Sequence, residues 1–227
     1  MKKKLIVFTL CAISLALLTA CGSRNIDLKD YTIEERINLF TAEDTLYGVS
    51  LSSGMRESDY NLDGIKNEMV EFGVLTIARN DGEPLANDTY SYTLTIGEET
   101  LSGTLEKSQV DNSYSTDIER HIPNDANINV EIKFTGYTFH QDLTNTSADF
   151  SVDMSTAINI ANEELSSDIR NILNDNAKIE VITKILKDYS TEEVKRYYWY
   201  IGVISTNGDT IGILIDANSG EVIAKKV

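Results

Sequence analysis

Alternation of apolar and polar residues with a period of two dominates the middle of this 227-residue chain. In Tyr90–Ile96 and again in Ile128–Phe134, every second residue is apolar, so the apolar side chains of each segment fall on one face of a strand. Turn residues such as Asn80–Pro84 and Pro123–Asp125 separate six or seven such segments. Short alternating strands at roughly ten-residue spacing predict an antiparallel β-sandwich, which we place at residues 45–146.

The pattern changes after a polar stretch at residues 143–151, where we expect a domain boundary. Residues 151–173 then carry apolar residues at helical spacing, with Ser155 as the expected N-cap. Three strands and a short terminal strand follow, and Asn207-Gly208 is a typical hairpin turn. A helix with one apolar face must cover one face of the sheet that follows it. We therefore expect an α+β domain at residues 152–227.

Three elements of this segment resemble the PepSY family. The likeness lies in Ala157-x-x-x-Ala161, in the strand Tyr198–Val203, and in the ending Ile215–Val222. The resemblance implies a PepSY-like domain made of a helix and an antiparallel sheet. Such domains occur in propeptides of secreted metallopeptidases and in cell-surface proteins. The resemblance therefore also implies a partner that is a peptidase or another surface protein, which this chain would bind or restrain.

The first 20 residues have the three parts of a secretory signal. Lys2–Lys4 precede the apolar run Leu5–Leu18, and small residues end the segment. Leu18-Thr19-Ala20-Cys21 resembles the lipobox of bacterial lipoproteins, which implies cleavage before Cys21 and acylation of its thiol. We therefore expect residues 1–20 to be a signal peptide and the mature protein to be lipid-anchored on the extracytoplasmic face of the cell membrane. The alternative is an ordinary signal peptide with a cysteine at the junction by chance.

Residues 21–44 would connect this anchor to the first domain. Tyr31–Phe40 places Ile33, Ile37 and Phe40 at helical spacing, and Thr32 is a suitable cap. A short helix and an extended tether are both compatible with this pattern.

Charge and cysteine content exclude several classes of partner and site. Without residues 1–20 the chain keeps 17 basic and 36 acidic side chains, a formal net charge of −19. A field of that sign opposes binding to nucleic acid and to anionic lipid. Cys21 is the only cysteine after the leader, so the mature chain has neither an internal disulfide nor a cysteine zinc site.

One segment matches the first half of a calcium loop. Asp59, Asn61 and Asp63 alternate and are followed by Gly64, the pattern in which oxygen ligands converge on one cation. The bidentate glutamate of such a loop belongs at the twelfth position, where this chain has Val70. The alternative is an ordinary polar turn with Asp63-Gly64 at its tip. We expect no cofactor other than this calcium ion.

The segment Tyr197–Tyr200 has the densest aromatic composition of the chain. Alternation sends Trp199 and Tyr200 to opposite faces of a strand, and one face should pack beneath the helix. The other face either is structural or forms an exposed platform for a peptide or a glycan. Asp216–Glu221 predicts a hairpin turn rather than a cation site. His121 and His140 each lack a neighbouring histidine, so we expect structural roles for both.

Sequence motifs of familiar enzymes do not occur in this chain. It has no nucleophile elbow, no metalloprotease helix, no P-loop and no dinucleotide fingerprint. We therefore expect a non-enzymatic binding module at the cell surface. The alternatives are a calcium-dependent surface module and a hydrolase that uses an unrecognised pair of carboxylates.

Overall fold

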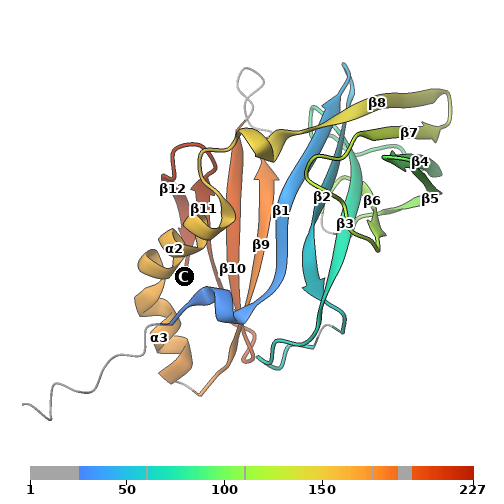
Figure 1. The fold of residues 1–227 in the computed structure, drawn as a ribbon. Coiled ribbons are helices and arrows are strands. Elements are labelled where there is room, and N and C mark those ends of the chain that lie inside the picture. The colour runs from blue at the N-terminus through green and yellow to red at the C-terminus, as the bar shows by residue number, and fades with distance from the viewer. Residues whose placement is uncertain (1–25, 60, 110, 175, 189–195) are drawn as a thin grey trace, which may run out of the picture.

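The structure is a computed structural model that describes residues 26–59, 61–109, 111–174, 176–188 and 196–227. Strands dominate the described residues (Figure 1). The first eight strands are β1 (Thr32–Glu43), β2 (Tyr47–Glu57), β3 (Met69–Arg79), β4 (Tyr90–Ile96), β5 (Glu99–Lys107), β6 (Tyr114–Ile118), β7 (Ile128–Phe134) and β8 (Tyr137–Asn145). The last four are β9 (Ile179–Lys187), β10 (Tyr197–Ser205), β11 (Thr210–Asp216) and β12 (Val222–Lys226). The helical elements are η1 (Leu28–Tyr31), η2 (Thr146–Asp149), α2 (Met154–Glu164) and α3 (Ser166–Asn174).

All twelve strands belong to one sheet, and eight of them close into a ring. The order is β12-β11-β10-β9-β1-β2-β3-β6-β5-β4-β7-β8, and β8 pairs again with β1. The expected β-sandwich is therefore wrong, because the eight strands form a closed antiparallel barrel rather than two open sheets. The edges that a sandwich leaves open are joined here, β5 to β6 and β8 to β1, and this closure removes exposed strand edges.

Strand β1 occupies most of the segment for which we expected a short helix or a tether. Ile33 and Phe40 are buried, whereas Ile37 is 41% exposed. The register shifts between Arg36 and Asn38, so a bulge at Ile37 resets the alternation and gives apolar spacings that resemble those of a helix. The part of the expected tether before Ile26 lies outside the described residues, as does the signal peptide.

Strands β9–β12 extend the same sheet from the other side of β1, and we call them the wing. Strand β9 runs parallel to β1, with Glu35 opposite Thr183, and the other wing strands follow in antiparallel order. The expected separate PepSY-like domain of one helix and its own sheet is therefore wrong as a description of the fold. Two helices cover the wing, and Asp153, rather than Ser155, caps α2 by accepting a hydrogen bond from the Thr156 N–H.

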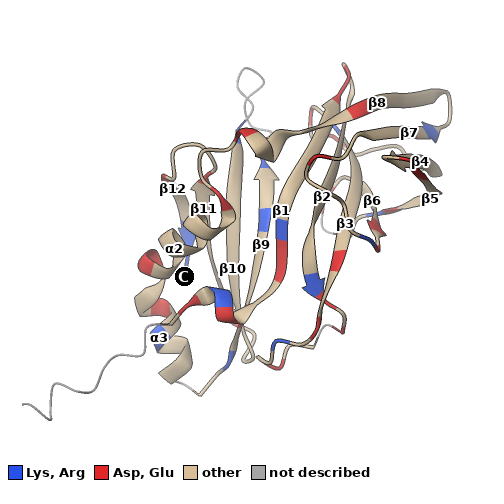
Figure 2. Ribbon diagram, in the orientation of Figure 1, with Lys and Arg blue, Asp and Glu red and all other residues tan. Residues whose placement is uncertain are grey.

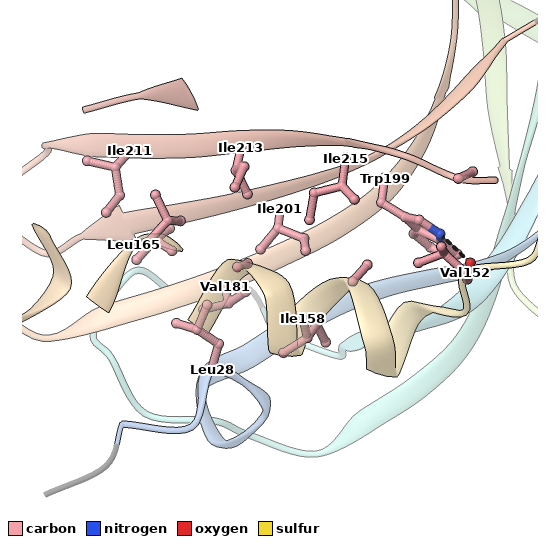
Figure 3. Packing of buried hydrophobic residues seen from close by; sticks show 14 of the residues in the cluster. Leu28, Val152, Ile158, Leu165, Val181, Trp199, Ile201, Ile211, Ile213 and Ile215 are labelled. Carbon is pink, nitrogen blue, oxygen red and sulfur yellow. Dashed lines mark hydrogen bonds between the residues drawn. The ribbon is translucent and has the colours of Figure 1, made fainter. Parts of the chain in front are cut away.

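The sheet has two hydrophobic cores. One lies inside the closed ring and is built from alternate residues of its strands, including Leu51, Leu94 and Val130, each fully buried. The other lies between the wing and the helices, where Ile158 of α2 meets Ile201 of β10 (Figure 3). The helices lie over one face of the wing, so its strands bury their apolar side chains there.

Candidate functional site

The wing leaves one face of its sheet without a covering helix, and we call this the open face. On the covered face, Trp199 is 2% exposed and its indole Nε1 donates a hydrogen bond of 2.8 Å to the Val152 carbonyl oxygen (Figure 3). Most of the alternate residues, which point the other way, are half-buried, and none of these belongs to either core. They are Ile182, Lys184 and Leu186 of β9, Tyr198, Tyr200 and Ile204 of β10, and Leu214 of β11.

The open face is apolar where a wet sheet face is ordinarily polar. A one-sided antiparallel sheet normally alternates apolar residues with polar ones that face water. Here five aliphatic or aromatic positions of β9 and β10 share the face with Lys184 and with the buried Glu180. Each of these five apolar side chains is only half-buried, so the face leaves part of their apolar surface in contact with solvent. Alternation therefore placed Tyr198 and Tyr200 on this face correctly, whereas their use as a binding platform stays a prediction.

Tyr200 lies flat on bare backbone at the centre of the open face. Gly202 and Gly212 are paired across β10 and β11. A Cβ atom at Gly202 would lie 2.8 Å from the Tyr200 Oη, and one at Gly212 would lie 3.1 Å from the Tyr200 ring. The two glycines therefore create a shallow seat for the ring. Glycines inside strands commonly mark such close approaches, and this was a signal that the sequence analysis did not use.

Lys184 places a positive charge next to this ring. Its Nζ lies 5.3 Å from the centroid of the Tyr200 ring, within the range of a cation–π interaction. Burial is the main cause that lowers the pKa of Lys184, and repulsion from Arg36 acts in the same direction, whereas attraction to Glu34 and Asp111 opposes this shift. Among the described residues, no carboxylate lies within ion-pair distance of its ammonium group. Lys184 is therefore a partly desolvated cation that a ligand carboxylate can pair with.

The charged surface continues from the wing onto the ring. Arg36 and Arg56 stack on Phe72, with guanidinium carbons 5.6 and 4.7 Å from the ring centroid. Each arginine has its own carboxylate, at 2.7 Å in Glu34 and 2.6 Å in Asp117. Basic and acidic positions of β1 and β9 accordingly lie side by side at mid-sheet (Figure 2). Because both arginines are already paired, Lys184 is the cation of this cluster that is available to a ligand.

The proposed calcium loop is fastened to the start of β9. The carboxylate of Glu180 accepts hydrogen bonds from the backbone N–H groups of Asp63 and Gly64, at 2.9 and 2.7 Å. Lys178 donates to the Asp63 carbonyl oxygen at 2.9 Å. The Asp63 carboxylate itself accepts from the Ile65 N–H at 2.8 Å, which is the geometry of a polar turn. These contacts are those of an ordinary polar turn, and calcium binding by Asp59, Asn61 and Asp63 stays a prediction.

Other candidate side chains remain apart in the structure. Within the described residues, no group of three or more histidine, cysteine, aspartate or glutamate side chains is placed to hold a metal ion. His121 pairs with Glu71 at 2.7 Å, and His140 lies 3.0 Å from Asn129. The Asp216 carboxylate accepts from the backbone N–H groups of the following turn, which confirms the predicted turn.

A hollow of about 270 Å³ opens on the opposite side of the wing, beside the first turn of α2. Ile37, Phe150 and Trp199 supply most of its apolar wall, and Asp153 and Ser155 lie at its rim. A second hollow, of about 340 Å³, lies on the ring between β3 and the turn before β6. Neither hollow includes a residue of the open face.

The anchor cysteine, Cys21, lies outside the described residues. In the part of the chain that the structure describes, no helix combines the length and the apolar character needed to cross a bilayer. Comparison with known proteins adds no relative to this description: no family model matches the chain, and no curated protein or solved structure is similar to it.

Proposed function

We propose that this chain is a non-enzymatic binding protein that is lipid-anchored through Cys21 outside the cytoplasmic membrane and holds a partner protein on its open face. The partner presents apolar side chains for Tyr198, Tyr200 and Leu214, and a carboxylate for Lys184. A surface peptidase or another envelope protein fits this description. The observation that carries the proposal is the unpaired, partly desolvated Lys184 beside the exposed ring of Tyr200.

The energetic argument rests on desolvation. A lysine whose pKa is lowered by burial is destabilising while it is charged and unpaired. A carboxylate that arrives with an apolar segment removes this cost and buries the surrounding aliphatic side chains in the same step. Aromatic residues at the centre of an interface commonly dominate its binding energy. Tyr200 has this position and is already held in one orientation by the two glycines beneath it.

The test is photo-crosslinking on intact cells, with a photoreactive amino acid in place of Leu214 on the open face. Leu46, which is 46% exposed on the ring, is the matched control position. We expect a discrete crosslinked product from position 214 alone. In that background Lys184→Glu should abolish the product, and Lys184→Arg should retain it. Equal products from both positions, or a product that Lys184→Glu leaves unchanged, would contradict the proposal.

A further inference from the structure

The end of the sheet where the described chain begins also carries a loop that hydrogen bonds hold in place. This loop has exposed aliphatic side chains. The helical turn η1 contacts the start of β9, and residues 61–68 are held to the same part of β9 by Glu180 and Lys178. Both segments lie at the lower end of the sheet in Figure 1. We call residues 61–68 the basal loop. Its contacts with β9 fix its position relative to η1.

The basal loop turns two large aliphatic side chains to solvent. Leu62 is 37% exposed and Ile65 is 52% exposed, the latter more than any other described aliphatic residue except the C-terminal Val227. A flexible loop would tend to fold such side chains inward, but the backbone of this one is held. Gly64 adopts a φ of +67° and lies against Lys178, where a Cβ atom would be 2.2 Å from the lysine Cβ. The exposure of Leu62 and Ile65 is therefore built into the fold.

The length of chain before η1 sets how far this end lies from the membrane. Ile26 is the fifth residue after Cys21, so a fully extended chain between the two would span about 18 Å. An acyl chain on Cys21 therefore places η1, and the basal loop with it, close to the lipid headgroups. Aliphatic side chains at that depth are stabilised by entering the boundary between headgroups and acyl chains.

We infer that Leu62 and Ile65 of the basal loop insert into the bilayer surface and set the orientation of the anchored protein. This inference rests on the proposed acylation of Cys21. In this orientation the strands of the wing run away from the membrane, and the open face is presented sideways to partners in the envelope. The occupant of the loop surface is the lipid bilayer. Asp63 and Glu68 outnumber Lys66 in the loop, and the resulting negative charge favours zwitterionic over anionic lipid.

The experiment is tryptophan quenching in the acylated full-length protein, reconstituted into phosphatidylcholine vesicles that contain lipid brominated near the headgroup. The natural Trp199 is 2% exposed and serves as the baseline. We expect Leu62→Trp to lose about half of its added fluorescence, because the ring sits at the headgroup boundary. Leu46→Trp, which lies at the opposite end of β2, is the matched control and should lose none.

A second pair of variants keeps the test independent of folding. In the double variant Leu62→Asp and Ile65→Asp, thermal melting should be unchanged. Hydrogen exchange at the amides of its basal loop should be as fast in vesicles as in detergent-free solution. Equal quenching at positions 62 and 46, or none at either, would overturn the inference. Incorporation of labelled fatty acid is measured first: an unacylated protein refutes the anchor, whereas an acylated protein without quenching refutes the loop contact alone.

Discussion

The two faces of the wing are made by the same strands and differ in what covers them. On the covered face, Trp199 and Ile201 are almost completely buried under α2 and α3. On the other face, Tyr198 and Tyr200 are half-buried, and no helix of the described chain lies over them. Strand β10 thus has the composition of a strand that is buried on both sides, although only one side is covered within the described chain. This comparison supports our proposal that a partner supplies the second covering, and the following predictions test it.

Substitution of Trp199 and of Tyr200, which are adjacent in β10, should give the largest difference in stability between the two faces. Trp199→Ala removes a buried indole and leaves the Val152 carbonyl oxygen without its donor, so we expect the free energy of unfolding to fall by about 3–5 kcal/mol. Tyr200→Ala should cost about 1 kcal/mol, because its ring is partly exposed. Urea unfolding measures both. Similar losses for the two variants would mean that the open face is an ordinary core.

Glu180 is the exception on the open side, because it is 1% exposed where the basal loop covers the sheet. Glu180→Ala leaves the N–H groups of Asp63 and Gly64 without an acceptor, and we expect a loss of about 1–3 kcal/mol. Hydrogen exchange at these two amides should also accelerate. Lys184→Ala, on the same strand and face, is the control and should leave both amides protected. Unchanged exchange in Glu180→Ala would show that the loop is held by other contacts.

The covering helices can be weakened at the cap of α2. Asp153→Ala should destabilise the protein by about 1 kcal/mol, whereas Asp153→Asn keeps a good cap and should cost less. The hydrogen bond from Thr156 lowers the pKa of Asp153 below its ordinary value of 3.8. A lowered pKa contributes stability that is present above the unfolded-state pKa and is lost as the pH falls through the folded-state pKa.

The pH dependence of the cap therefore has a definite sign. Thermal melting should show the full difference between parent and Asp153→Ala at neutral pH and a shrinking difference below about pH 4. In Asp153→Asn the cap does not titrate, so its difference from the parent should narrow or reverse in the same range. A difference between parent and Asp153→Ala that grows on acidification would contradict this assignment.

Local patterns predicted most strands but missed β1, and they predicted neither the pairing of the strands nor the closed ring. Alternation in Ile128–Phe134 placed the buried face of β7 correctly, because a period of two depends only on neighbouring residues. The parallel pair of β1 and β9 joins Thr32 to Val181, and no local signal records so distant a contact. The same limit applies to the site: alternation separates Trp199 from Tyr200, whereas the glycine seat appears only when the register sets Gly202 opposite Gly212.

Substitution of Lys184 should have the smallest effect on stability and the most specific effect on partner binding. Burial and repulsion from Arg36 disfavour its charged form and lower its pKa in the native protein. At pH values between this lowered pKa and the ordinary 10.5, the unfolded chain therefore binds more protons than the native one. Stability should therefore rise with pH across that window, and Lys184→Met should be more stable than the parent by about 0.5 kcal/mol at neutral pH. The variant should lose its partner in the crosslinking experiment, while Lys184→Arg retains both charge and binding. A residue that lowers stability and supports binding belongs to a functional surface, so a Lys184→Met protein that is less stable, or that still binds, would return the open face to a structural role.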